Sequence, residues 1–153
     1  MSNRVVKLCA TFFYAGYLPF APGTMASVAG FLLYIFLCRH MTLCALAFLF
    51  IVLVGFLTSG KIERLLNEKD PSCVVIDEVS GAMIAIFMLP LTPSVIVTAF
   101  FLFRAFDMFK IYPIDKLEDL KGATGIMMDD IIAGVYTNVT MQVALQLKGL
   151  FSL

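Results

Sequence analysis

Charged residues are scarce in this chain. They make up 14% of its 153 residues, whereas hydrophobic residues make up 61%, against about 45–50% in an average globular domain. A water-soluble domain of this size needs more polar surface, because a small body has a large surface relative to its volume. The composition therefore predicts an integral membrane protein, and the length predicts one domain over residues 1–153.

Neither charge sign is in excess, and paired cysteines are missing. The 11 basic residues balance the 11 acidic ones, so no field of one sign attracts nucleic acid, and we expect no nucleic-acid partner. The four cysteines (Cys9, Cys38, Cys44 and Cys73) form no Cys-x-x-Cys pair. Zinc, redox and disulfide sites are therefore disfavoured, and free buried thiols are expected.

Uncharged apolar runs favour membrane-embedded helices. The longest, residues 41–58, has eighteen residues and nearly matches a hydrocarbon core of about 30 Å. Residues 25–38 form another such run, separated from the first only by Arg39-His40. So short a polar break predicts a helical hairpin. Residues 8–13 are expected to form a short membrane-embedded helix rather than part of a cleaved signal peptide.

Further along the chain the pattern repeats with shorter runs. Residues 79–89 and 94–103 predict a second hairpin that turns at Pro90–Pro93. Residues 131–147 predict a final apolar helix. Its Asn138, Gln142 and Gln146 recur every four residues as a polar stripe suited to helix contacts. The fold class expected is therefore all-α, a small multi-helix membrane protein built from helical hairpins.

Hairpin topology predicts which charges share one face of the membrane. Each hairpin returns the chain to its starting side, so the segments before and after both hairpins lie together. All eleven acidic residues fall within 63–130, in the segments on this side. Its basic residues outnumber Arg39 on the other side, which predicts that the charged face is cytoplasmic. They are Lys61, Arg64, Lys69, Arg104, Lys110, Lys116 and Lys121.

Three charged groups on this face are candidates for chemistry. Ionised residues at the edge of a bilayer are costly unless they are paired, hydrated or bound to metal. Mg²⁺ prefers oxygen ligands and often shares its shell with phosphate oxygens. Alternatively, acids before apolar helices could be helix caps, and an Arg–Asp couple could be a structural ion pair. The groups are Asp77-Glu78, Arg104-x-x-Asp107-x-x-Lys110 and Asp129-Asp130.

Two glycine-bearing loops adjoin predicted helices. Pro22-Gly-Thr-Met-Ala-Ser27 opens the first hairpin, and the free N–H groups of a helix N-terminus can bind phosphate. Thr24 or Ser27 could equally be an ordinary cap. Gly122-Ala-Thr-Gly125 is compatible with a plain turn or with a loop that approaches a ligand closely.

Several phosphatase chemistries lack their residues here. A cysteine phosphatase needs an arginine six positions after its cysteine, and no cysteine here has one. A haloacid-dehalogenase phosphatase needs an Asp-x-Asp triplet, which does not occur, and a P-loop is absent. The one histidine, His40, falls on the opposite face from the acids. Metal-activated attack by water, with carboxylates holding the metal, is the chemistry that remains.

Four motifs in order resemble the phosphatidylglycerophosphatase A family over residues 15–145. The resemblance implies an all-α fold and Mg²⁺-dependent hydrolysis of phosphatidylglycerophosphate to phosphatidylglycerol and phosphate. It also implies the bacterial inner membrane, with the site facing the cytoplasm, and a phospholipid substrate. The motifs are Pro22-Gly-Thr-Met-Ala-Ser27, Val75-Ile-Asp-Glu-Val-Ser-Gly81, Phe103-Arg-Ala-Phe-Asp107 with Lys110 and Pro113, and Gly125-Ile-Met-Met-Asp-Asp-Ile-Ile-Ala-Gly134.

Our hypothesis assigns a role to each candidate residue. Arg104 and Lys110 bind the phosphate and offset its developing charge, while Asp107 is a metal ligand or the base that orients water. Asp130 is counted as both catalytic and metal-binding. The proposed Mg²⁺ ligands are Asp77, Glu78, Asp129 and Asp130, and the proposed additional substrate-binding groups are Gly23, Thr24 and Ser27.

Three other functions stay open. The first is hydrolysis of another lipid or soluble phosphomonoester, because the family includes soluble members. The second is a CDP-alcohol type phosphotransferase, whose Asp-Gly-x-x-Ala-Arg pattern is missing here. The third is a non-enzymatic cation-binding membrane protein, which would need charges near mid-span, whereas the long apolar runs carry none. The sequence does not predict an oligomeric state.

Overall fold

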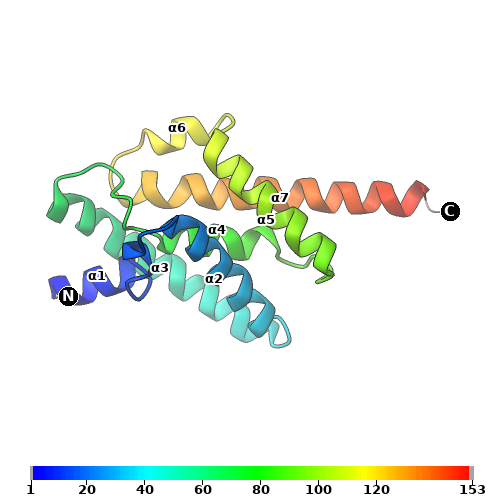
Figure 1. Ribbon diagram of the computed structural model, residues 1–153, viewed down its shortest axis with the longest axis horizontal. Helices are drawn as coiled ribbons and strands as arrows, with labels where there is room; N and C mark the ends of the chain where they lie inside the picture. The colour runs from blue at the N-terminus through cyan, green and yellow to red at the C-terminus, as the bar shows by residue number, and fades with distance from the viewer. Residues whose placement is uncertain (1, 152–153) are drawn as a thin grey trace.

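The computed structural model describes residues 2–151, and within this range it contains helices and no strands. This confirms the all-α prediction. Figure 1 shows the helices in chain order. They are α1 (Asn3–Ala10), the 3₁₀ helix η1 (Ala15–Tyr17), α2 (Pro22–Leu37), α3 (Met41–Leu66), α4 (Ile76–Ala85), α5 (Pro93–Phe109), α6 (Ile114–Glu118) and α7 (Ala123–Phe151).

Helix α4 is the central element of the fold. Eight of its ten residues are buried, and it packs between α2 and α7 and also contacts α3 and α5. The long helix α7 packs on α3, α4, α5 and α6, and its C-terminal end projects beyond the other helices (Figure 1). The N-terminus of α4 therefore lies among other helices, near the start of α2, the end of α5 and the second turn of α7.

The contact between α4 and α7 depends on two glycines. A methyl group at Gly81 would overlap the backbone of Asp130, and one at Gly134 would overlap the carbonyl of Gly81. The two backbones therefore approach each other directly, which only residues without a side chain permit. This crossing brings the first turn of α4 close to the second turn of α7, where the two acidic pairs lie.

The C-terminal end of α4 is held by side chains of other helices. The Asn138 amide of α7 donates to the carbonyl oxygens of Ile84 (3.1 Å) and Phe87 (2.7 Å). The Tyr34 hydroxyl accepts a hydrogen bond from the Met88 N–H at 2.8 Å. Carbonyl groups at a helix end need such partners when buried, so α4 can stop inside the protein.

The helix ends differ from the sequence-based boundaries. The helix expected over residues 79–89 is α4, which begins earlier, at Ile76, and ends at Ala85. It can end there because the Asn138 amide donates hydrogen bonds to the carbonyl groups at its end. In the expected polar stripe, Gln142 contacts Asn138, whereas Gln146 is exposed. Helices α3 and α5 continue through charged residues to Leu66 and Phe109, since helical hydrogen bonding does not require apolar side chains.

The last helix requires the most important correction. It was expected over 131–147, with Asp129 and Asp130 just before it, but α7 begins at Ala123. Gly122, at φ +76°, turns the chain immediately before it. The two aspartates therefore lie in the second turn of α7. An N-terminal capping residue lies immediately before the first turn of a helix, so the capping interpretation of Asp129 and Asp130 is wrong.

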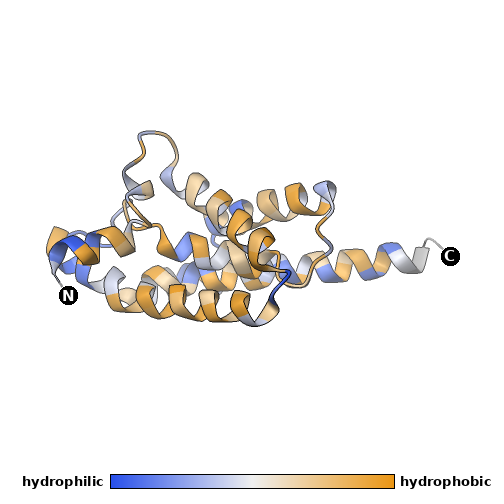
Figure 2. Cartoon of the chain, turned by 90° about the horizontal axis from the view of Figure 1, so that it is seen from below, coloured by the Kyte–Doolittle hydropathy of each residue, from blue (hydrophilic) through white to orange (hydrophobic). Residues whose placement is uncertain are grey.

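One helix in the described part of the chain is long and apolar enough to cross a membrane, and this is α3. Only 22% of its most apolar 18-residue window is buried inside the protein. Apolar side chains such as Phe36 and Phe50 are exposed on α2 and α3. Figure 2 shows these two helices covered by hydrophobic residues, with hydrophilic residues gathered toward the end where α1 begins.

A candidate active site at the start of α4

A polar cavity of about 280 Å³ opens where the helix ends meet. The start of α2, the start of α4, the end of α5 and the second turn of α7 bound it, together with the loop from α3 to α4. The three charged groups expected from the sequence therefore do converge. The charged residues that line the cavity are Asp70, Asp77, Glu78, Arg104, Asp107, Lys110, Asp129 and Asp130.

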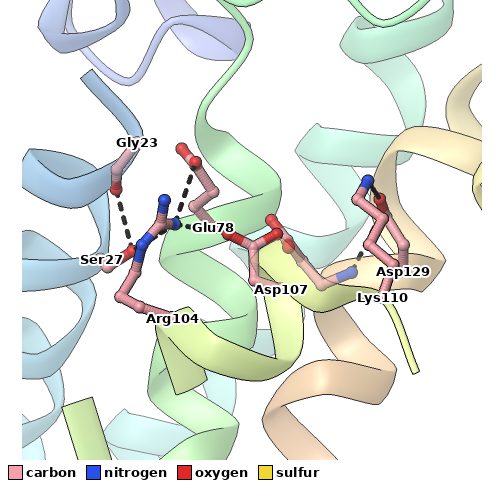
Figure 3. A network of polar contacts seen from close by, with 8 residues as sticks. Gly23, Ser27, Glu78, Arg104, Asp107, Lys110 and Asp129 are labelled. Atoms are coloured by element: carbon pink, nitrogen blue, oxygen red, sulfur yellow. Dashed lines mark hydrogen bonds and ion pairs between the residues drawn. The ribbon is translucent and has the colours of Figure 1, made fainter. Parts of the chain in front are cut away.

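Arg104 connects three helices at this cavity. Its guanidinium donates to Asp107 Oδ2 at 2.6 Å, to Glu78 Oε1 at 3.4 Å and to Ser27 Oγ at 3.5 Å (Figure 3). Arg104, Glu78 and Asp107 side chains are each less than one-fifth exposed. A largely buried arginine with these partners is fixed in position, and the guanidinium has further N–H groups with which it can bind another anion.

Lys110 forms the second cation of the cavity. Its ammonium donates to Asp129 Oδ2 at 2.9 Å, and Figure 3 shows this pair beside the Arg104 cluster. Asp129 Oδ1 accepts the N–H of Asp130 at 3.0 Å. Lys110 ends α5 with a left-handed backbone, φ 43°, which directs the chain away while its side chain stays at the cavity.

Two buried carboxylate oxygens at the cavity have no hydrogen-bond partner among the described residues. They are Asp77 Oδ1 and Glu78 Oε2. Burial and repulsion from Glu78 and Asp129 raise the pKa of Asp77 well above its usual range. Burial raises the pKa of Glu78 to about 8, although Arg104 opposes this. Unpaired buried carboxylates are costly, and a bound cation removes that cost.

The acids on α7 behave in the same way. Burial raises the pKa of Asp129 to about 6 despite its contact with Lys110. Burial, followed by repulsion from Asp77 and Asp107, raises the pKa of Asp130 well above its usual range. The cavity thus offers several oxygen donors and too little positive charge, which is the donor set that a hard divalent cation prefers.

The carboxylates are not gathered around a single point. Within residues 2–151, no three side chains of the metal-binding types stand close enough together to hold an ion as they are. Glu78 and Asp107 reach instead toward Arg104, and Asp129 reaches toward Lys110. Because these cations hold the carboxylates apart, a metal ion could be held here only after side-chain rotation within the cavity.

The start of α2 supplies backbone donors to the cavity wall. Gly23 and Thr24 line the cavity, and their N–H groups lie in the first turn, where a helix offers no acceptor. Ala21 is the N-cap and has no capping side chain. Gly23 lies so close to Glu78 that a methyl group there would overlap the carboxylate. Glycine therefore allows the close approach of α2 to α4.

Ser27 was expected to bind substrate, but it does not line the cavity. It is fully buried behind the wall, where its hydroxyl donates to the Gly23 carbonyl at 2.8 Å and accepts from Arg104. The rotation of α2 directs Ser27 toward α5, so the Ser27 hydroxyl helps to position Arg104. The segment Gly122–Gly125 also lies outside this cavity. Gly122 forms a plain turn before α7, and residues 123–125 belong to the first turn of that helix.

Sequence reasoning missed two polar residues of the cavity wall, Asp70 and Ser72. Both come from the loop between α3 and α4, and from the sequence Asp70 was placed only among the acidic residues of the charged face. The Asp70 charge contributes to raising the pKa values of Asp77, Glu78 and Asp129. The available signal was its place before Pro71, in the segment that leads directly to Asp77.

The raised pKa values predict how pH affects stability when divalent cations are removed. Glu78 has an ordinary pKa of 4.5 and a folded value of about 8. Its stabilising contribution is therefore complete below about pH 4.5 and is lost as pH rises through 8. We expect the melting temperature of chelator-treated protein to fall across this range, and Mg²⁺ to raise it most at the alkaline end. Thermal scans across pH test this, and a melting temperature that climbs across the range, without any effect of Mg²⁺, contradicts it.

Comparisons with known proteins agree with the motif pattern. The chain matches the family model described as phosphatidylglycerophosphatase A over residues 8–145. It is 32% identical over 144 residues to a Haemophilus influenzae protein named phosphatidylglycerophosphatase A, covering 89% of this chain and 86% of the relative. An Escherichia coli protein of the same name is 33% identical over 131 residues, covering 84% and 76%.

A third relative carries a different substrate in its name. A Bacteroides thetaiotaomicron protein named as a phosphatidylinositol-3-phosphatase is 39% identical over 147 residues, covering 90% of this chain and 91% of the relative. No solved structure matches the chain.

Proposed function

Since the chain belongs to the phosphatidylglycerophosphatase A family, and is thus a phosphoric monoester hydrolase, we propose that it hydrolyses phosphatidylglycerophosphate to phosphatidylglycerol and phosphate with Mg²⁺ as cofactor. The observation that carries this proposal is the composition of the cavity. Six carboxylates and two cations converge there, and two buried carboxylate oxygens lack a partner. This arrangement suits a divalent cation and a phosphate monoester side by side.

The residues that would hold Mg²⁺ are Asp77, Glu78, Asp129 and Asp130, with Asp70 at the rim. When bound at these residues, Mg²⁺ would supply charge neutralisation at the phosphate and activation of the attacking water. The unpartnered oxygens of Asp77 and Glu78 support their assignment as ligands. Occupation of the site also removes the repulsion that raises the pKa values of these acids.

Cations and backbone donors of the cavity would bind the phosphate. Arg104 can keep Asp107 on one side of its planar fork and present its other N–H groups to two phosphate oxygens. Lys110 contributes a second positive charge. The first-turn N–H groups of Gly23 and Thr24 would complete the seat at the start of α2.

Asp107 is the proposed base. It lies on the cavity wall and contacts Arg104, so the guanidinium holds its carboxylate in one orientation. From there it would accept a proton from the water that attacks phosphorus. The pair of Asp107 and Arg104 thus joins the proton acceptor to the group that stabilises charge on the phosphate oxygens.

We further propose a multi-pass location in the bacterial inner membrane with the cavity facing the cytoplasm. The length, apolarity and low burial of α3 support membrane insertion. The start of α2, which bounds the cavity, lies at one end of that helix, whereas the short turn of residues 38–40 lies at the other end (Figure 1). The excess of Lys and Arg on the cavity side supports its cytoplasmic placement.

A substrate panel tests the reaction. Phosphate release from phosphatidylglycerophosphate should be faster than from phosphatidylinositol 3-phosphate, because the family and two relatives carry the name of that activity. It should also be faster than from the deacylated headgroup phosphate, because the exposed apolar side chains of α2 and α3 suit a substrate held in a membrane. Each substrate is presented in the same detergent with Mg²⁺, and free phosphate is measured. Faster release from the inositol lipid would instead assign the activity that the Bacteroides relative's name indicates.

A further inference from the structure

An apolar groove runs along the seam between α2 and α5. It encloses about 210 Å³, and all of its lining side chains are aliphatic or aromatic. Val28, Phe31 and Leu32 form the α2 wall, and Val97 and Phe100 belong to the α5 wall. The rings of Phe31 and Phe100 meet edge to face, with centroids 5.7 Å apart, and form the floor where the two helices touch.

The groove continues the polar cavity along the same two helices. Thr24 lines the cavity and Val28 lines the groove, one helical turn (about 5.4 Å) further along α2. On α5, Arg104 lines the cavity, and Phe100 lies one turn away in the groove. The contact between Arg104 and Ser27 lies at the boundary. A single molecule that is polar at one end and apolar at the other would fit both compartments.

The direction of the groove also fits a lipid. From the cavity it runs along α2 toward the turn of residues 38–40, and therefore away from the proposed cytoplasmic face. From Val28 to Ile35 it extends about 10 Å along the helix axis. This is less than half of a hydrocarbon core of about 30 Å, so the groove can hold the part of an acyl chain nearest the headgroup.

A second apolar cavity does not share this property. It encloses about 250 Å³ and is lined by residues including Tyr34, Cys44 and Phe87. These lie at the end of α2, near the start of α3 and just beyond the end of α4, so this cavity is at the opposite end of α2 from the polar cavity. Its lining residues include no basic side chain.

We propose that the α2–α5 groove binds one acyl chain of a phosphomonoester lipid whose phosphate occupies the polar cavity. This inference rests on the proposed function and adds the means by which the enzyme selects a lipid over a soluble phosphomonoester. The headgroup alone would bind by charge. The groove adds a second contact that only an acylated substrate makes, and it orients the ester bond toward Asp107.

The chain contains no tryptophan, so a single introduced indole can report on the groove. Leu32→Trp places the reporter on the groove wall, and Leu46→Trp on α3 is its matched control. The two leucines are 60% and 59% exposed, and five residues separate each of them from the turn of residues 38–40. Two lipid probes are compared. One is a non-hydrolysable phosphonate analogue of phosphatidylglycerophosphate, and the other is phosphatidylglycerol itself. Both carry brominated acyl chains, which quench indole fluorescence.

In Mg²⁺-containing bilayers, the phosphonate should quench Leu32→Trp more strongly than brominated phosphatidylglycerol does at the same mole fraction. Leu46→Trp should respond equally to both lipids. Equal quenching of Leu32→Trp by the two lipids would overturn the groove assignment. Val97→Trp, on the opposite wall, gives the same comparison if Leu32→Trp does not fold.

Phosphate release by the wild-type protein separates this inference from the proposed reaction. Release from phosphatidylglycerophosphate without preferential quenching overturns the groove and leaves the reaction intact. Preferential quenching without release supports the groove as a lipid-binding site and contradicts the proposed reaction.

Discussion

Replacement of Asp130 by asparagine is expected to lower turnover by about 10³-fold, on the scale of other losses of active-site charge stabilisation. Asp130 is 3% exposed at the cavity wall, and asparagine keeps its shape while removing a charged oxygen. The position lies inside α7, so no cap is lost. Turnover is measured as phosphate release, and helicity and protein abundance should remain near wild type.

Stability provides a second readout for Asp130→Asn. Because burial and neighbouring acids raise the pKa of Asp130, the neutral amide should relieve repulsion and raise the melting temperature when Mg²⁺ is absent. The rise in melting temperature that Mg²⁺ gives the wild type should shrink. Asp115→Asn, at an exposed position on α6, is the control and should change neither property.

Asp129→Asn tests the other half of the pair. It should also reduce turnover severely, and it removes the carboxylate that holds Lys110. Near-normal activity in both single variants and in the double variant would show that the pair is structural. The metal site would then have to be rebuilt around Asp77, Glu78 and Asp107.

Replacement of Arg104 by lysine should lower kcat/KM by about 10²-fold although the charge is retained, because lysine cannot reproduce a planar fork. The contacts to Ser27, Glu78 and Asp107 all use one guanidinium nitrogen, Nη1, which leaves the other nitrogens for phosphate. An ammonium has one nitrogen and cannot serve both sets of partners in a fixed plane. Asp107 would lose its fixed orientation and the phosphate would lose a two-point contact. Steady-state kinetics with phosphatidylglycerophosphate measure the effect.

The matched control for Arg104 is Arg64→Lys at an exposed position near the end of α3. It should leave kcat and KM unchanged. A fully active Arg104→Lys enzyme would show that charge alone suffices at this position. Arg104 would then be a structural ion-pair partner, and phosphate binding would depend on Lys110 and the start of α2.

The convergence of the acidic pairs could be predicted from sequence because it depends on chain direction. Short turns between apolar runs send each helix back toward its starting side, so Asp77, Asp107 and Asp129 had to lie at one end. Helix boundaries were harder, because α7 begins in a polar stretch after Gly122 and α4 ends only because Asn138 reaches its carbonyl groups.

The detailed wall of the cavity depends on packing that sequence spacing does not encode. Asp70 reaches it through an irregular loop, whose path follows the position of α4 between α2 and α7. Ser27 was expected on the wall, but the rotation of α2 directs it to Arg104. Rotation of a helix about its axis is determined by close contacts such as Gly23 against Glu78, which appear only once the helices are packed.

The dependence of phosphate release on Mg²⁺ tests the proposed site most directly. Purified protein is treated with chelator and supplied with phosphatidylglycerophosphate, and Mg²⁺ is then returned stepwise while phosphate is measured. Release should fall to the enzyme-free background in chelator and recover with Mg²⁺, and Asp77→Asn should require much more Mg²⁺ for the same recovery. Undiminished release in chelator, or a normal Mg²⁺ requirement in Asp77→Asn, would contradict a metal-dependent site built on these carboxylates.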